Sequence, residues 1–291
     1  MKLIKQSFQF VNQKGFTLKD IYKHIEYCAR ISYKSQDKIT DTSYEKFVNM
    51  LESRGHDRPL EFGTVHLKMP EHEFRSLIDI LTSSRTYNDL WIHYKVVETW
   101  EEGYTVYVTT NYRYYKLMWN QMNTLSEYFD KTDSEYYPKR YTVHMILDRG
   151  VMDEFRTHVG LSHLAESTRY VNYSKKKFGS EVTFIEPCWE IRTANEVITP
   201  EGTHMSSDSL EFLTALKEAE DHYLSLLAKG WTPQQARSVL PLGIKSELIS
   251  CGFEDSWENF FKRRDAPDAH PMAQEIAKPM HEEFFKLTRA S

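Results

Sequence analysis

Three short clusters in the sequence combine arginine with other hydrogen-bonding side chains and could bind an anion. The first is the run Glu166–Tyr170, in which the hydroxyl groups of Ser167 and Thr168 precede Arg169. A guanidinium group offers a planar pair of donors to an anionic oxygen, and hydroxyl groups add neutral donors. The run therefore favours an anion such as a phosphate, although an ordinary polar loop has the same composition.

The other two clusters place an arginine at or near the end of a helix. Arg237 follows Thr232–Gln235, which reads as a capping box with proline at the first helical position. Arg264 follows the aromatic-rich segment Trp257–Phe261, which would anchor a helix to the core. Each arginine alone has a structural explanation, because an exposed helix arginine is solvated and a C-terminal one interacts favourably with the helix dipole.

Hydrophobic periodicity predicts the elements that must position these clusters. Apolar residues at helical spacing predict helices over residues 17–35, 41–55, 209–230, 256–265 and 270–289. Alternating β-branched and aromatic residues predict strands over residues 63–69, 104–112 and 140–148. No linker-like stretch or internal repeat divides the chain, so we predict a single domain. The pattern indicates an α+β fold with strands gathered centrally and helices dominating the C-terminal half.

The composition argues against several classes of protein. The 37 Lys and Arg against 42 Asp and Glu give a net charge of −5, which offers no electrostatic case for nucleic-acid binding. No apolar run approaches the roughly 20 residues needed to cross a bilayer. The three cysteines are far apart and suggest no disulfide framework. We therefore expect a cytoplasmic protein that binds neither nucleic acid nor membrane.

The histidines and glycines restrict the kind of site that the chain can build. The histidines lack the i, i+4 spacing of a helical zinc pair, so we expect no metal site. The glycines form neither of the common phosphate-binding loops. Any bound nucleotide must therefore be held by side chains.

Taken together and in this order, the clusters resemble the flavin-dependent thymidylate synthases, the ThyX family. The matching segments are CARISYKS at 28–35, RGHDRPLEF at 54–62, TNYRYYK at 110–116, the long segment 148–179, ARSVLPLGIKSEL at 236–248 and SWENFFKRRDAPDAHPMAQEIA at 256–277. The family signature is R-H-R, seven residues and Ser, followed by x-R-Y. In this chain Thr157–Val159 stands at the R-H-R position, and seven residues later come Ser167 and then Thr168–Tyr170. The frame is intact, but both flanking arginines are replaced.

The resemblance implies an α+β fold with a central, mostly antiparallel sheet flanked by helices. It implies a single ThyX-like domain over residues 1–291, with an elaborated region at about 62–145. It also implies a homotetramer whose active sites lie at subunit interfaces. Such enzymes use FAD, reduced by NADPH, and 5,10-methylenetetrahydrofolate to methylate C5 of dUMP, a pyrimidine nucleoside monophosphate, giving dTMP.

The resemblance also assigns roles to particular residues. Ser167, Thr168 and Arg169 would bind dUMP on its phosphate side, and Arg237 would add a second positive contact. Glu154 stands where the family has a polar residue beside the pyrimidine. Arg264 matches the arginine that stabilises N3-deprotonated uracil, so that C5 becomes nucleophilic without a cysteine.

The departures from the family pattern fall mainly on the flavin side. The positions whose residue types differ are Thr157, Val159, Arg58, Ala165, Phe253 and Asp255. The residues that the resemblance still places near the flavin are Ser32, His56, Arg58, His158 and Asn259. Losing two or three charge-assisted contacts, each contributing roughly 1.5–3 kcal/mol, would weaken FAD binding by several orders of magnitude.

Three hypotheses about function therefore stand side by side. The first is an FAD-dependent dUMP methylase whose flavin is held by substituted contacts such as Arg58 or Arg156. The second is a flavin-independent or altered C5-hydroxymethyltransferase acting on a pyrimidine nucleotide, a transfer from methylenetetrahydrofolate that needs no hydride. The third is a non-catalytic nucleotide-binding subunit that assembles with a complete homologue. The choice between uracil and cytosine, and between ribose and deoxyribose, depends on pocket geometry.

Overall fold

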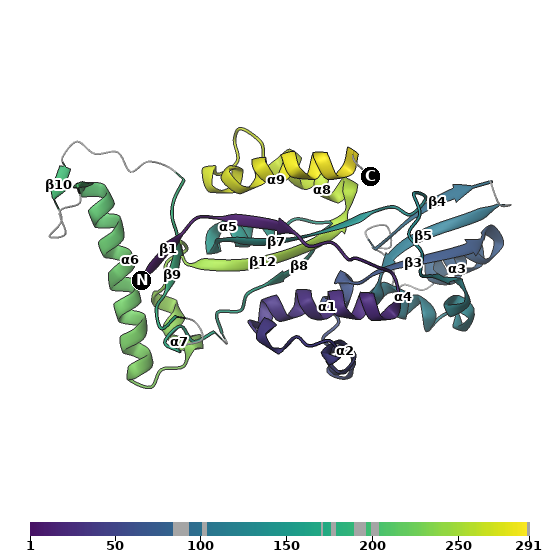
Figure 1. The fold of residues 1–291 in the computed structure, drawn as a ribbon, viewed down its shortest axis with the longest axis horizontal. Helices are drawn as coiled ribbons and strands as arrows, with labels where there is room; N and C mark the ends of the chain where they lie inside the picture. The colour runs from purple at the N-terminus through teal and green to yellow at the C-terminus, as the bar shows by residue number, and fades with distance from the viewer. Residues whose placement is uncertain are drawn as a thin grey trace.

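The computed structural model describes residues 1–83, 93–100, 104–169, 171–175, 179–188, 196–198 and 204–289. Tyr170, the last residue of the signature, lies outside the described residues. The predicted α+β class is confirmed, with antiparallel sheets flanked by helices (Figure 1). None of the helices in the described ranges is both long and apolar enough to span a bilayer.

The strands of the described residues form two larger sheets and two small ones. The central sheet has the order β2 (Ser7–Phe10), β7 (Arg140–Asp148), β12 (Lys245–Phe253) and β8 (Ser162–Ala165), and its pairs are antiparallel. The second sheet has the order β4 (Tyr94–Thr99), β5 (Thr105–Asn111), β3 (Thr64–Pro70) and β6 (Phe129–Asp130). The small sheets are β1 (Lys2–Ile4) with β9 (Thr183–Ile185), and β10 (Glu196–Ile198) with β11 (His204–Ser206). The strands of the second sheet all fall inside the region of about 62–145 that we predict to be an elaboration.

The helices predicted from the apolar periodicity of the sequence are confirmed. Their bounds are α1 Leu18–Tyr33, α2 Ser43–Ser53, α3 Glu71–Ser83, α4 Tyr112–Trp119, α5 Arg149–Phe155, α6 Ser207–Ala228, α7 Pro233–Ala236, α8 Glu254–Arg264 and α9 Pro271–Arg289. Short 3-10 turns include η2 Arg58–Phe62 and η6 Arg237–Val239. Each helix and strand predicted from periodicity has a counterpart here, whereas α3, α4, α5 and several strands were not predicted.

The most important unpredicted strand is β12, which lies in the middle of the central sheet. It does not alternate between apolar and polar residues, because helices cover both of its faces and almost all of its residues are buried. Leu248 packs with the hydrophobic cluster of α8 and α9, whereas Ile249 and Cys251 pack against α1. Figure 1 shows the same layering, with α8 and α9 on one side of the sheet and α1 on the other.

Buried histidines link the stability of this fold to pH. Burial lowers the pKa of His24 to about 3, and it lowers the pKa values of His66 and His163 to about 4. As the pH falls, these histidines therefore take up protons in the unfolded chain near the ordinary histidine pKa of 6.5, whereas in the folded chain they do so only at a lower pH. We expect the free energy of unfolding to fall as the pH drops from 6.5 towards 4, as measured by urea denaturation at a series of pH values.

A pair of histidine variants tests this explanation. Replacing buried His66 with Gln should flatten the pH dependence of the unfolding free energy between pH 6.5 and 4, because one titrating site is removed. The matched variant is His222→Gln, since His222 is exposed on α6 and should leave the slope unchanged. Equal slopes for the wild type and His66→Gln would contradict the explanation.

Candidate functional site

The structure brings together the first two clusters singled out in the sequence. Arg237 donates from Nη1 to Oγ1 of Thr168 at 2.8 Å, and the Nε of Arg169 donates to the side-chain oxygen of Gln234 at 3.0 Å. The hydroxyl of Ser167 accepts a bond from the backbone N–H of Arg169 at 3.4 Å. Two guanidinium groups and two hydroxyl groups thus converge from segments that are distant in sequence, and the group suits an oxyanion such as a phosphate. We call Ser167, Thr168, Arg169 and Arg237 the anion group.

Local structure on both segments explains this convergence. The run Ser167–Arg169 begins one residue after Glu166, which directly follows β8, and β8 is held in the central sheet by its pairing with β12. On the other segment, Thr232 and Gln235 form the predicted capping box at the start of α7. Ala236 is fully buried and anchors this short helix, so Arg237 is presented where the chain turns into η6.

Glu154 and Arg264 form a second group, on α5 and α8. The Arg264 guanidinium bonds the Glu154 carboxylate at 3.2 Å and the Glu154 carbonyl at 2.8 Å. Its Nε atom is buried and finds no hydrogen-bond partner in the described part of the chain. Both helices pack into the hydrophobic cluster of α8 and α9, whereas Ala236 belongs to the cluster beside α6. Within one chain the candidate substrate residues are thus built as two groups in different parts of the fold.

The residues expected near the flavin have varied environments. Arg58, His56 and Asn259 are exposed, and the Ser32 hydroxyl donates to the carbonyl of Ala29 at 2.8 Å. His158 is buried against the ring of Phe260, with its Nε2 atom unpaired among the described residues. Of these five residues, only Arg58 is an arginine or a lysine.

Several positions where the family contacts flavin are committed to other partners in this chain. The Thr157 hydroxyl donates to the carbonyl of Glu154 at 2.7 Å, and Val159 is 71% exposed with no polar group to offer. Phe253 is buried, and Asp255 forms an ion pair with Lys95. These positions therefore do not supply the charge-assisted contacts that the replaced residues would provide.

Arg58 and Arg156 nevertheless offer a replacement. Burial is the main cause of the low pKa of His163, and the positive charges of His158, Arg58 and Arg156 lower it further. Arg156 also lies 3.4 Å from the carboxylate of Asp153.

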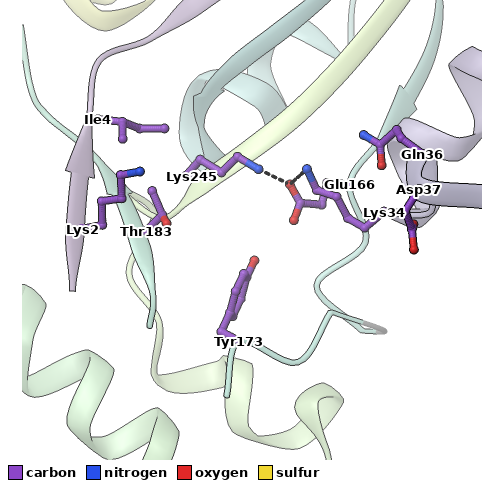
Figure 2. A pocket seen from close by; sticks show the side chains of 9 residues that line it. All are labelled: Lys2, Ile4, Lys34, Gln36, Asp37, Glu166, Tyr173, Thr183 and Lys245. Atoms are coloured by element: carbon purple, nitrogen blue, oxygen red, sulfur yellow. Dashed lines mark hydrogen bonds and ion pairs between the residues drawn. The ribbon is translucent and has the colours of Figure 1, made fainter. Parts of the chain in front are cut away.

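Sequence reasoning missed a cluster of four charged residues, in which two buried glutamates meet two partly buried lysines. Lys34 and Lys245 pair with both Glu166 and Glu247, and we call these four residues the charge cluster. Lys34, Glu166 and Lys245 line a cavity of about 470 Å³, together with Tyr173 and others (Figure 2). The only sequence signals were the position of Glu166 beside Ser167 and the i, i+2 spacing of Lys245 and Glu247 on one strand face.

In the charge cluster, the two positive lysines are paired with the two glutamates. Burial raises the pKa of Glu247, but a hydrogen bond from His144 and the charges of the two lysines outweigh this and bring that pKa well below its ordinary value. Glu247 is therefore ionised at neutral pH. Among the described residues, no set of three or more His, Cys, Asp or Glu side chains is arranged to hold a metal ion.

Comparisons with known proteins identify the family. The family model for thymidylate synthase complementing proteins matches residues 138–288, more than half of the chain, so the chain belongs to that family. The match confirms the resemblance to ThyX enzymes, which are generally flavin-dependent. No curated protein sequence gives a significant match.

Solved structures with a related outline include two of the UMP/dUMP methylase PolB from Streptomyces cacaoi. The one bound with 5-Br dUMP is 15% identical with a TM-score of 0.42, and the alignment covers 99% of this chain and 93% of that one. The one bound with 5-Br UMP is 16% identical with a TM-score of 0.43, and the alignment covers 99% and 92%.

Proposed function

We propose that this family member methylates C5 of dUMP to form dTMP, with methylenetetrahydrofolate as the carbon donor and FAD and NADPH as redox partners. The observation that carries the proposal is the convergence of Arg169, Arg237 and Thr168 in a thymidylate synthase family chain. The anion group offers the phosphate of dUMP two guanidinium groups and neutral hydroxyl donors. Charge-assisted bonds of this kind are about twice as strong as neutral ones.

Arg264 is proposed to stabilise negative charge on the uracil ring. An arginine stays protonated at neutral pH, so it cannot act as a base but can lower the free energy of a ring anion in a site that excludes water. Glu154 holds the guanidinium by two contacts and fixes its orientation. Since Arg264 and the anion group lie in different parts of one chain, we propose that the site is completed between subunits of a homotetramer.

Arg58 and Arg156 are proposed to hold the pyrophosphate of FAD, and His158 offers its unpaired Nε2 atom to the same cofactor. When bound, the flavin supplies the electrons that reduce the transferred carbon to a methyl group. The altered positions Thr157, Val159 and Asp255 favour a second candidate function, which is flavin-independent hydroxymethylation of the same carbon.

Product analysis separates these functions. The purified protein is incubated with dUMP and methylenetetrahydrofolate labelled in the transferred carbon, with and without FAD and NADPH. We expect labelled dTMP only when both redox partners are present. Labelled 5-hydroxymethyl-dUMP without them would support the second candidate. If the nucleotide stays unlabelled under all conditions, both enzymatic functions are contradicted. The hypothesis of a non-catalytic nucleotide-binding subunit would then remain.

Replacing Arg237 with Ala tests the anion group directly. We expect the dissociation constant for dUMP to rise by about tenfold to a hundredfold, because one charge-assisted contact to the phosphate is lost. Isothermal titration calorimetry measures this constant. The control is Lys229→Ala, which removes an exposed positive charge from the same region and should leave binding unchanged. Unchanged dUMP affinity in Arg237→Ala would contradict the assignment.

A further inference from the structure

His163 connects strand β12 to the turn between α5 and β8 through both nitrogen atoms of its ring. It lies on β8 directly opposite Ser250 on β12, and its Nδ1 atom is 2.8 Å from the hydroxyl oxygen of Ser250. Its Nε2 atom is 3.1 Å from the backbone carbonyl oxygen of His158, which lies in the turn. Since His163 is only 7% exposed, both contacts are shielded from solvent.

The partners of His163 determine which ring nitrogen carries the proton. A carbonyl oxygen can only accept a hydrogen bond, so Nε2 must donate to His158. Because burial brings the pKa of His163 to about 4, the ring is neutral at neutral pH and Nδ1 carries no proton. The hydroxyl of Ser250 therefore donates to Nδ1. Both ring nitrogens are satisfied in this tautomer, which fixes the orientation of the ring.

The turn that His163 contacts carries the altered part of the signature. It comprises residues 156–161, and Thr157 and Val159 within it are exposed. The histidine between them, His158, is buried against the ring of Phe260. His158 is thus the residue through which this part of the turn is attached to the rest of the protein.

Close packing brings the same turn against β12. Gly160 adopts a φ of 100°, a conformation that favours glycine. A Cβ atom at Gly252 on β12 would lie 3.0 Å from the carbonyl oxygen of Gly160, so the close approach depends on glycine there. The backbone therefore permits the contact between turn and sheet, and the N–H of His163 supplies a hydrogen bond that holds it.

We propose that His163 is a positioning residue, which fixes the turn carrying Arg156 and His158 through the carbonyl of His158 and thereby sets the affinity of the site for FAD. The inference rests on the proposed function, because that function assigns these two residues to the cofactor. His163 acts through the backbone of its neighbour and is not assigned a contact with FAD. Loss of its Nε2–H alone should therefore loosen the turn and weaken FAD binding.

Two amide variants separate the roles of the two ring nitrogens. In His163→Gln the side-chain amide reaches the position of Nε2 and can still donate to the carbonyl of His158. In His163→Asn the shorter side chain reaches only the position of Nδ1, so it can bond Ser250 but not His158. The two variants carry the same polar group and differ by one methylene, so a difference between them reports on the bond to His158.

Hydrogen–deuterium exchange, measured by mass spectrometry on the protein without cofactor, tests whether the turn is held. The backbone N–H groups of Arg156, Thr157 and His158 donate to carbonyl groups of α5. We expect them to exchange at least about tenfold faster in His163→Asn than in the wild type, and within about threefold of the wild type in His163→Gln. Unchanged exchange in His163→Asn, or equal acceleration in both variants, would overturn the inference and leave the proposed function in place.

Titration with FAD, followed by flavin fluorescence, tests the consequence for the site. We expect the dissociation constant for FAD to rise at least about tenfold in His163→Asn and to stay within about threefold of the wild type in His163→Gln. The dissociation constant for dUMP, measured by calorimetry, should change by less than about threefold in both variants. If the wild type and His163→Asn bind FAD equally well, only the inference is overturned. If the wild type binds no FAD, the inference and the flavin-dependent function are both overturned.

Neutron crystallography of the unaltered protein decides the case in which His163→Asn does not fold, as judged by circular dichroism. We expect a proton on Nε2 of His163, directed at the carbonyl of His158, and none on Nδ1. A proton on Nδ1 alone would show that His163 cannot donate to His158, and the inference would be rejected.

Discussion

The variant Arg264→Ala is expected to lower kcat for dUMP by about two to three orders of magnitude, while the dissociation constant for dUMP changes by less than about tenfold. The reason is that a group acting on charge that develops during the reaction contributes little to binding of the ground state. Arg264 is suited to this role because Glu154 orients its guanidinium and its Nε atom has no partner in the described residues.

Single-turnover kinetics and calorimetry on the same preparations separate the two effects. The control is Arg263→Ala, since Arg263 is the exposed neighbour at the same end of α8. Its removal changes the net charge by the same amount as Arg264→Ala, and it also removes a positive charge near the negative end of the helix dipole. We expect Arg263→Ala to behave as the wild type. Equal losses of turnover and binding in Arg264→Ala would mean that Arg264 only binds the nucleotide, and the activating role would then be rejected.

The variant Trp257→Ala is expected to reduce the free energy of unfolding by about 3–5 kcal/mol. Trp257 is fully buried on α8, and its indole N–H donates to the carbonyl of Tyr141 at 3.0 Å. Its ring also packs against Phe260 and Phe284, so the substitution leaves a cavity where α8 and α9 meet the central sheet. Urea denaturation followed by circular dichroism measures the change.

Glu258→Ala is the matched substitution on the exposed side of α8. It should change the unfolding free energy by no more than about 0.5 kcal/mol, because no buried contact is lost. A loss of less than about 1 kcal/mol in Trp257→Ala would show that α8 is not anchored by this side chain. It would also weaken the argument that the fold fixes the position of Arg264.

Much of the secondary structure was predictable because it depends on local patterns. The apolar stripe of α1 and the capping box at Thr232 are local in sequence, and both appear in the structure. Strand β12 could not be predicted in the same way, because a strand that is buried on both faces has no alternation of apolar and polar residues. The family was also readable from sequence, since the signature frame around Ser167 survives the loss of its flanking arginines.

The candidate site was predictable in its membership but not in its geometry. The sequence singled out Arg169, Arg237 and Arg264 as separate clusters. The structure joins the first two in the anion group and places Arg264 with Glu154 on another part of the chain. No local signal distinguishes these arrangements, because each depends on how strands and helices distant in sequence pack together.

The sequence by itself determined the class of protein and the chemical groups available to it: arginines and hydroxyls for an anion, an arginine at the end of α8, and altered residues on the flavin side. Only the tertiary structure decided which of these groups meet. The charge cluster shows this most clearly, since Lys34, Glu166 and Lys245 come from three distant segments and look like ordinary surface charges in the sequence. Burying opposite charges is favourable only when the partners are brought into contact, and the folding of α1 against β8 and β12 brings them there.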